Sequence, residues 1–525
     1  MVRHQEFVYI EMISMTGDLI EKLRESFKYN ADKVFLIDSL TNLQFTYREI
    51  EDLSLRFAKM LEEKEIRKGD KVAVFLPNCI EFILLYFACM QIGAIPIPIN
   101  QKLTPEEIDF ILRNSDAKCL FISKNMEFCI LDKAYSSNIV SFIPSTDKEF
   151  SFLNAIKNKD KISEKSFVRL SDDDLFIIIY TSGTTKYPKG VMVPYSGIIQ
   201  NALDYSKIQK LDANSRFYQI LSLSYMAGFY NLMILPFLIG GSVVLDQAFG
   251  INTAMMFWKK IEKYSINVIW LVPSMVSMIL TLDRSDEGIA YCQKGCIKSA
   301  LIGTAPLPKM LKMTFEKKYS ISLYENYGST EALFVSTNSP LIQKNDGVGM
   351  PLPGQKVYIQ DIHSKNCAVN QIGEIVLQSE RLMKGYYKNI DETNNNISNG
   401  LFYTGDMGYF DENGHLFIVG RKKDLIIRGG INISPKEIED TLEQHPVIKE
   451  VAVIGIPNEL KGEKIIAIML GDSTQSSEEL KKYCLQYLAA FKIPEEFIFI
   501  NSLPKSVTGK IQKNKLKEMY LAGSF

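Results

Sequence analysis

The chain has 525 residues, of which 46% are hydrophobic and 23% charged, an ordinary composition for a globular protein of several domains. Lysine and arginine total 60, aspartate and glutamate total 61, and the net charge of −1 gives no reason to expect nucleic acid or an anionic membrane as a partner. The 8 cysteines include no CxxC pair and the 4 histidines are scattered. Neither a zinc site nor a disulfide framework is therefore expected, and reduced thiols in a cytoplasmic enzyme are the favoured interpretation.

Helix and strand patterns alternate over roughly the first 170 residues. Thr46 and Glu49 form a capping-box pattern that opens an amphipathic helix through Met60. Residues 71–76, 94–99 and 119–122 are predicted strands, and predicted helices over 81–90 and from Thr104-Pro105 onward separate them. This rhythm predicts a parallel sheet flanked by helices.

A second round of the same alternation begins near Leu175 and continues to about Pro340. Within it, the uncharged run from 225 to 245 has about the length of a membrane span. Because the run contains Asn231, Pro236 and Gly240-Gly241, it favours a buried helix, a turn and a strand. No membrane span is expected.

The pattern changes after residue 340. Short predicted strands at 356–359, 373–377 and 416–419 lie between glycine, proline and asparagine turns, which indicates a small β subdomain. Charged residues gather at 421–424, where helix and strand patterns resume. The expected fold is therefore α/β: a large domain (residues 1–422) of two βαβ-type layered subdomains and a small β subdomain, then a small α+β domain (residues 423–525).

The strongest local chemistry follows a buried-strand run at 176–180. The next ten residues read TSGTTKYPKG, from Thr181 to Gly190. Small residues let backbone N–H groups approach phosphate oxygens, hydroxyls donate hydrogen bonds, and lysines balance charge. An ordinary polar turn is the alternative, and the GxxxxGK[ST] phosphate loop does not match.

This segment resembles the signature loop YTSGTTGxPKG of the adenylate-forming superfamily, which includes acyl-CoA synthetases, adenylation domains of peptide synthetases, and luciferases. Lys186 stands where the signature has glycine, which restricts the backbone there. Four further segments resemble family motifs in the family's order: 300–307 (GxAPL), 324–331 (YGxTE), 403–406 with 420–424 (TGD and GRxKD), and 504–510 (PxTxTGK). The resemblance places the chain in the acyl-CoA synthetase branch and implies ATP, Mg²⁺ and CoA as cofactors.

The resemblance also assigns nucleotide-binding roles. Tyr327 is expected to stack on adenine beside Gly328, or else to be a core tyrosine at a tight turn. Asp406 is expected to accept the ribose hydroxyls with Arg421 nearby, or else to cap its own turn. The complete predicted nucleotide set is Thr181, Ser182, Gly183, Thr184, Thr185, Lys189, Gly303, Thr304, Ala305, Asn326, Tyr327, Gly328, Ser329, Thr330, Asp406, Arg421 and Lys510.

For catalysis, the resemblance implies that Lys510 stabilises charge developing on the α-phosphate and that Thr330 donates to a phosphate. Glu331 matches the Mg²⁺ carboxylate. Family members rotate the C-terminal domain between their two half-reactions. Lys423 lies at the implied hinge, and Gly429-Gly430 at the implied thiol tunnel, although a plain hairpin turn is the alternative for these glycines.

The acid and the thiol acceptor are less defined. Tyr225 replaces a common histidine, and Met226 stands where amino-acid activators carry aspartate. A predicted acid pocket, favouring a fatty or other hydrophobic acid, comprises Tyr225, Met226, Phe229, Gly303 and Phe334, although these side chains could instead be core. CoA is the favoured acceptor. The alternatives are a carrier-protein phosphopantetheine, a nucleotide-binding relative without ligase activity, and a luciferase-type reaction. The oligomeric state is open.

Overall fold

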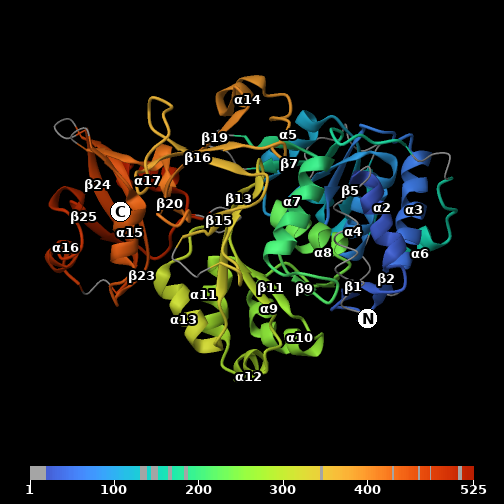
Figure 1. Ribbon diagram of the computed structural model, residues 1–525, viewed down its shortest axis with the longest axis horizontal. Helices are drawn as coiled ribbons and strands as arrows, with labels where there is room; N and C mark the ends of the chain where they lie inside the picture. Colours follow the sequence, from blue (N-terminus) through green and yellow to red (C-terminus); the bar gives the residue numbers. More distant parts are fainter. Residues whose placement is uncertain are drawn as a thin grey trace.

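The computed structural model describes residues 19–129, 139–142, 152–163, 168–181, 187–342, 347–428, 431–458, 462–472, 475–505 and 511–525. They form a large α/β domain and a smaller α+β C-terminal domain, which lies at one end of the molecule (left in Figure 1). The predicted fold class is confirmed.

A four-stranded parallel sheet in the order β4–β3–β5–β6 forms one layer of the large domain. The predicted capping box is present: Thr46 Oγ1 accepts from Glu49 N at 3.2 Å, and the Glu49 carboxylate accepts from Thr46 N at 2.7 Å. The strands and their helices are β3 (Lys71–Phe75), β4 (Ile95–Pro98), β5 (Ala117–Ser123), β6 (Ile139–Phe142), α3 (Tyr47–Glu63), α4 (Ile80–Ile92), α5 (Pro105–Ser115) and α6 (Phe152–Lys157). Helix α4 is apolar on almost every side and buried along its whole length, as expected for a helix inside a core.

The strand before the predicted phosphate loop is part of a hairpin. β7 (Leu175–Thr181) pairs antiparallel with β8 (Lys189–Pro194), so the second round of alternation begins with a hairpin and not with a parallel strand. Thr181 pairs with Lys189 at its open end. Ile178 and Tyr180 share a hydrophobic cluster with Ile97 of β4, which fixes the hairpin against the first sheet.

A nine-stranded sheet forms the second layer, in the order β15–β14–β13–β12–β11–β9–β10–β1–β2. Its strands are β1 (Val34–Asp38), β2 (Gln44–Thr46), β9 (Arg216–Gln219), β10 (Ser242–Leu245), β11 (Val268–Leu271), β12 (Ser299–Ile302), β13 (Leu323–Ser329), β14 (Leu333–Thr337) and β15 (Met350–Pro351). The associated helices are α2 (Leu19–Tyr29), α7 (Tyr195–Ile208), α9 (Ile251–Met255), α10 (Phe257–Lys263), α11 (Pro273–Leu282), α12 (Glu287–Gln293) and α13 (Lys309–Tyr319).

Strand β1 does not belong to the sheet that its position in the sequence suggests. This strand pairs parallel with β10, about 200 residues later, and not with the sheet of its own neighbours. The reason is packing: the Tyr47 hydroxyl donates to the Gly241 carbonyl at 2.8 Å, and its ring stacks on Phe237 at 5.4 Å. Strand β1, near the start of the chain, is therefore part of the nine-stranded sheet of the second subdomain.

The apolar run from 225 to 245 folds as a π-helix η4 (Ala227–Ile234), helix α8 (Leu235–Leu238) and strand β10. The predicted buried helix, turn and strand are confirmed. Among the described residues, no helix is long and apolar enough to cross a membrane.

The remaining strands form two antiparallel-rich sheets. The small β subdomain contains β16 (Lys356–Gln360), β17 (Gly373–Gln378), α14 (Ile390–Asn396), β18 (Ile397–Ser398), β19 (Leu401–Phe410) and β20 (Leu416–Arg421). The C-terminal domain contains β21 (Ile426–Arg428), β22 (Ile431–Ile433), α15 (Pro435–Leu442), β23 (Ile448–Asn458), β24 (Gly462–Gly471), α16 (Ser477–Cys484), β25 (Glu496–Phe499) and α17 (Lys513–Leu521). It has its own hydrophobic core, which includes Ile426, Leu442 and Met469.

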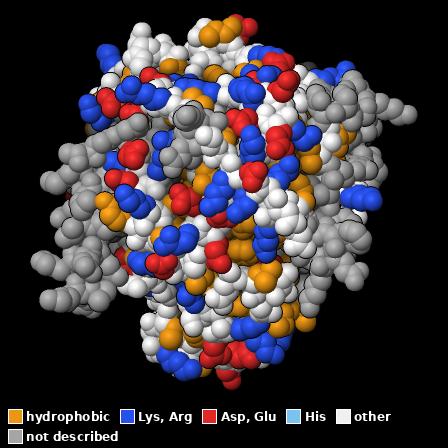
Figure 2. All heavy atoms as spheres, turned by 90° about the vertical axis from the view of Figure 1, so that its right-hand side faces the viewer, with side chains coloured by type: hydrophobic (Ala, Val, Ile, Leu, Met, Phe, Trp, Pro, Cys, Tyr) orange, Lys and Arg blue, Asp and Glu red, His pale blue; other side chains and the backbone are white. Residues whose placement is uncertain are grey.

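The surface carries mixed charge. On the face shown in Figure 2, lysine and arginine side chains lie among aspartate and glutamate side chains, without a wide area of one sign. This arrangement agrees with the net charge of −1.

Candidate active site

The carboxyl ends of parallel strands β12 and β13 form the floor of the site. Asn326 ties them together: its amide donates to the Ile302 carbonyl at 3.0 Å and accepts from the Tyr205 hydroxyl and from Thr337 Oγ1, each at 2.6 Å. A side chain on Gly303 would meet the Asn326 carbonyl at 3.1 Å. The structure thus gives Asn326, a predicted nucleotide ligand, an internal role that fixes Gly303.

The turn after β12 carries the next predicted residues. Thr304 has φ +71°, which β-branched residues rarely adopt, and Ala305 follows it half-buried. Strain of this kind is held in place by surrounding structure and clusters at ligand sites. The geometry is compatible with the predicted role of this turn against adenine.

Three motif residues meet in what we call the ribose corner: Tyr327, Asp406 and Arg421. The Tyr327 hydroxyl donates to Asp406 Oδ2 at 2.7 Å, and Arg421 Nε pairs with Asp406 Oδ1 at 2.7 Å. Asp406 and Arg421 are directly opposite each other on β19 and β20. Burial raises the pKa of the Tyr327 hydroxyl well above its usual value and the Asp406 carboxylate raises it further, so this group remains a donor. Each carboxylate oxygen keeps a second lone pair, which suits a diol.

The turn between β13 and β14 holds the other motif residues. A side chain on Gly328 would lie 2.1 Å from the Leu333 carbonyl oxygen, so the hairpin itself requires glycine there. Ser329, Thr330 and Glu331 are half-buried beyond it. Among the residues that the structure describes, the buried Ser329 hydroxyl has no hydrogen-bond partner, and it could therefore donate to a ligand.

A second cluster, which we call the phosphate corner, contains Lys189, Glu331, Tyr386 and Glu392. Lys189 is largely buried and forms an ion pair with Glu392. The Lys189 Nζ atom lies 5.6 Å from the centre of the Tyr386 ring, and the Tyr386 hydroxyl donates to Glu331 Oε1 at 3.1 Å. The hydrogen bond from Lys189 lowers the pKa of Glu392. The residue predicted to bind phosphate, Lys189, and the predicted metal carboxylate, Glu331, therefore contact the same tyrosine.

The two corners are neighbours. Tyr327, which donates to Asp406, and Glu331, which accepts from Tyr386, are four residues apart at the turn of the β13–β14 hairpin. The motifs at 189, 331, 406 and 421 thus lie in one site.

Glu331 suits a hard divalent cation. One carboxylate oxygen accepts from Tyr386, and the other makes no hydrogen bond to a described residue. Mg²⁺ commonly takes one or two carboxylates together with phosphate oxygens and water. Within the described ranges no cluster of three metal-ligating side chains occurs.

Several predicted residues lie outside the described ranges: Ser182, Gly183, Thr184, Thr185 and Lys186 of the phosphate loop, Gly429 and Gly430, and Lys510. Their roles stay predictions. The flanks of the Lys510 segment are described. Lys505 and Ile511 form a β-bridge, Lys505 pairs with Glu450 at 2.8 Å, and Lys513 pairs with Glu439 at 2.6 Å. Both ends of the segment are therefore anchored to the C-terminal domain. Lys423 lies in a short 3-10 turn (Lys422–Asp424) directly after β20.

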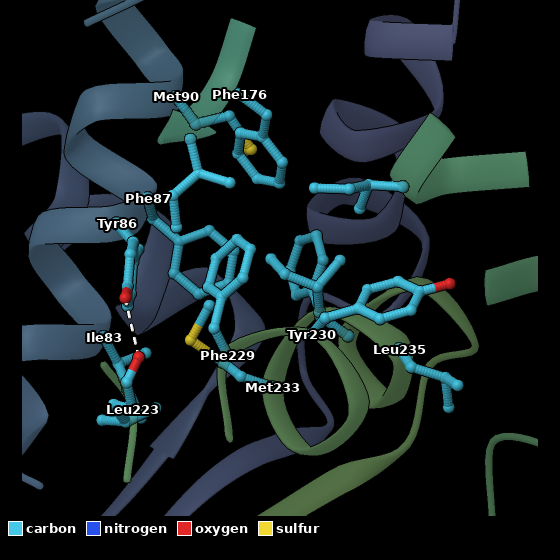
Figure 3. Packing of buried hydrophobic residues seen from close by; sticks show 14 of the residues in the cluster. Ile83, Tyr86, Phe87, Met90, Phe176, Leu223, Phe229, Tyr230, Met233 and Leu235 are labelled. Atoms are coloured by element: carbon cyan, nitrogen blue, oxygen red, sulfur yellow. Dashed lines mark hydrogen bonds between the residues drawn. The ribbon is translucent and has the colours of Figure 1, made fainter. Parts of the chain in front are cut away.

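The acid side is aromatic and densely packed. The Phe229 ring is buried, 4.6 Å from Tyr86 and 5.4 Å from Phe176 by ring centres, and the close-up shows it among Met90, Phe87 and Met233 (Figure 3). Phe334 stacks on Tyr205 at 3.9 Å. These contacts place Phe229 and Phe334 in the core, the alternative that the sequence left open.

Tyr225 differs from these core residues. Its hydroxyl is buried without a hydrogen-bond partner among the described residues, and it borders a small cavity that also touches Tyr180 and Pro188. Burial raises the pKa of this hydroxyl, so it is a donor at neutral pH. Met226 is buried at the start of η4. Tyr225 is thus the predicted pocket residue with an unused polar group.

Sequence reasoning missed Tyr386 and Glu392. The chain from 383 to 387 pairs with β8, through Met192 N to the Gly385 carbonyl at 3.0 Å and Tyr387 N to the Gly190 carbonyl at 2.7 Å. This pairing brings Tyr386 beside Lys189. The available signal was the Gly385-Tyr386-Tyr387 run, in which Gly385 has φ +120°.

Two family models match the chain: "AMP-binding enzyme" over residues 23–387 and "AMP-binding enzyme C-terminal domain" over residues 437–510. Oxalate–CoA ligase of Arabidopsis thaliana is 29% identical and covers 97% of this chain and 99% of its own. The putative acyl-CoA synthetase YngI of Bacillus subtilis is 31% identical, with 97% of each chain covered. Among solved structures, ATP-bound MatB from Rhodopseudomonas palustris matches with a TM-score of 0.87 and 25% identity, covering 95% of this chain and 99% of that one.

Proposed function

The chain belongs to the AMP-binding enzyme family and is an AMP-forming acid–thiol ligase, and from this premise we propose that it joins a hydrophobic carboxylic acid to coenzyme A through an acyl-adenylate. The observation that carries the proposal is that the ribose corner and the phosphate corner meet at the turn of the β13–β14 hairpin. It brings a diol acceptor, a phosphate cation and a metal carboxylate together.

In the first step, a carboxylate oxygen of the acid attacks the α-phosphorus of ATP and pyrophosphate leaves. No general base is required, because the acid is already ionised at neutral pH. Asp406 would hold the ribose, and Lys189, Thr330 and the loop 181–185 would hold the phosphates. Lys510 would stabilise the charge that develops at the α-phosphate. Mg²⁺ at Glu331 would neutralise phosphate charge when bound.

In the second step, the thiol of CoA attacks the acyl carbon and AMP leaves. The proposed domain boundary, 422/423, falls just after Arg421, so rotation about Lys423 would move Lys510 away while Arg421 stays with the large domain. The glycines 429 and 430 would then border the pantetheine path. Support comes from the separate core of the C-terminal domain, which can move as a unit.

The acid remains the least constrained substrate. Relatives include ligases named for oxalate, sulfoacetate and long-chain fatty acids, so family membership leaves the choice open. The apolar side chain of Met226 favours a hydrophobic acid, and the small size of the cavity beside Tyr225 favours a compact acyl group over a long chain. A carrier-protein phosphopantetheine is the alternative acceptor. We place the enzyme in the cytoplasm, where ATP and CoA are supplied.

A panel of acids tests this function. Purified protein is incubated with ATP, Mg²⁺ and each of oxalate, malonate, benzoate, hexanoate and palmitate, with and without CoA, and acyl-AMP and acyl-CoA are measured by mass. We expect acid-dependent pyrophosphate release and acyl-CoA formation with benzoate or hexanoate. Transfer only to a holo carrier protein would remove CoA from the proposal, and activity confined to dicarboxylates would remove the hydrophobic acid.

A further inference from the structure

The phosphate corner contains a side chain that no motif assigned. Tyr386 is 7% exposed and contacts the lysine expected to bind phosphate and the carboxylate expected to bind Mg²⁺. Its hydroxyl donates to Glu331, and the ammonium of Lys189 lies over its ring.

The backbone around Tyr386 is fixed from two directions. Tyr386 forms a β-bridge with Val191 of β8, and its N–H donates to Thr393 Oγ1 at 2.9 Å. Lys189 lies on the same strand as Val191, two residues earlier. On the other side, the backbone N–H of Met383, three residues before Tyr386, donates to the Glu331 carbonyl at 2.8 Å. Both partners of the tyrosine side chain are therefore also tied to its own segment through the main chain.

The tyrosine chemistry suits this position. The Tyr386 hydroxyl donates to one carboxylate oxygen of Glu331 at 3.1 Å. This bond leaves the second oxygen of Glu331 for a metal and limits rotation of the carboxylate. The ring face attracts the Lys189 ammonium without neutralising it, so the lysine can still bind a phosphate.

We propose that Tyr386 is a positioning residue for adenylate formation, which orients the metal carboxylate Glu331 with its hydroxyl and the phosphate cation Lys189 with its ring. This inference rests on the proposed function, because it takes Glu331 and Lys189 as the metal and phosphate partners. It assigns two separable tasks to one side chain, and two substitutions divide them. Tyr386→Phe removes the hydroxyl and keeps the ring, whereas Tyr386→Leu removes both.

The test measures binding of α,β-methylene ATP, which cannot release pyrophosphate, by calorimetry across a Mg²⁺ series. We expect Tyr386→Phe to raise the half-saturating Mg²⁺ concentration about tenfold, the size typical for losing a partner of a metal ligand. Its affinity for the analogue at saturating Mg²⁺ should stay close to wild type. Tyr386→Leu should show the same Mg²⁺ shift and weaken the analogue roughly threefold to tenfold more.

Tyr387→Phe is the matched control. It removes a hydroxyl from the adjacent residue, which donates to Asp116 at 3.1 Å on the other side of the segment, and it should leave both values unchanged. Glu331→Gln tests the assignment of Glu331 as the metal carboxylate separately from the positioning role of Tyr386. If Glu331→Gln shifts the Mg²⁺ dependence and Tyr386→Phe does not, the positioning role is wrong while the proposed function stands.

If Glu331→Gln also leaves the Mg²⁺ dependence unchanged, the metal assignment fails, and with it this inference. If the wild-type protein does not bind the analogue, the proposed function itself fails. A purely structural tyrosine predicts a lower thermal midpoint for Tyr386→Phe with an unaltered Mg²⁺ dependence, and that result overturns the inference. Should Tyr386→Leu not fold, the Mg²⁺ shift of Tyr386→Phe alone decides.

Discussion

The side of the site proposed to bind the nucleotide (the nucleotide side) and the side proposed to bind the acid (the acid side) are built in opposite ways. On the nucleotide side, charged groups are paired with one another: Arg421 with Asp406, and Lys189 with Glu392. On the acid side, aromatic rings pack against aromatic rings, as between Phe334 and Tyr205, and the buried Tyr225 hydroxyl has no hydrogen-bond partner among the described residues.

This difference explains which part of the function is readable. Binding of ribose, phosphate and metal needs specific donors and acceptors at fixed positions, which leave short motifs in the sequence. Selection among acids depends on the shape left between apolar side chains, to which many residues contribute a little. Reaction type is therefore better defined here than the acid.

The largest expected effect belongs to Lys510. Lys510→Ala should lower acid-dependent ATP–pyrophosphate exchange about 100- to 1000-fold, because a positioned charge at the α-phosphate is lost. The control is Lys515→Ala, an exposed lysine of α17, which should keep wild-type exchange. Equal exchange by Lys510→Ala and wild type would contradict the nucleotide side as described.

Asp406 comes next. Asp406→Asn keeps the shape but replaces an anionic acceptor of Tyr327 and Arg421 with a neutral amide. Since hydrogen bonds to charged groups contribute about 1.5–3 kcal/mol, the KM for ATP should rise roughly 10- to 100-fold, with the KM for the acid unchanged. Asp361→Asn, in an exposed turn, serves as the control. If the KM for the acid rose and the KM for ATP did not, Asp406 would belong to the acid side of the site and not to the nucleotide side.

A substitution among the buried aromatic residues of the acid side should lower the stability of the protein without changing which acids it prefers. Phe229→Leu removes ring volume from a wholly buried position and should lower the free energy of unfolding by about 1–2 kcal/mol, measured in urea. The order of preference among acids should stay the same. If this variant accepts longer acids at unchanged stability, Phe229 lines the pocket after all, and the predicted acid pocket regains a member.

These outcomes also measure what the sequence can reveal. Capping boxes and single strands are local, so the helix from Tyr47 and the strand from Lys71 could be predicted. The structure brings the motif residues Tyr327, Asp406 and Arg421 into contact, and their roles stay predictions. The fold class followed from the same patterns. The positions of these residues in one site depended on the resemblance to a family.

Long-range pairing escaped prediction. Lys189 and Glu392 are 203 positions apart, and nothing near either residue signals the other. The same holds for β1, which joins β10, and for Asn326, whose amide looked available to a ligand and is bonded internally. In each case a contact between distant segments, decided by packing, overrides the local pattern.

The smallest effect tests the Lys189–Glu392 pair and has the opposite sign. Glu392→Gln frees Lys189 from a carboxylate that the phosphates of ATP must otherwise displace, so the KM for ATP should fall, by about threefold for an ion pair of this partial exposure. Asp173→Asn removes an exposed ion pair to Lys384 of the same segment and should change nothing.

The pH dependence of stability provides an independent test of the Lys189–Glu392 ion pair with the same variant. Because Lys189 lowers the pKa of Glu392 below its usual 4.5, the pair stabilises the folded protein above that pH, and the contribution disappears as the pH falls and the carboxylate is protonated. The difference in unfolding free energy between wild type and Glu392→Gln should therefore be present at pH 7 and shrink below pH 4.5. A higher KM for ATP in this variant would mean that Glu392 holds Lys189 in its working position, and the phosphate corner would then be as preorganised as the ribose corner.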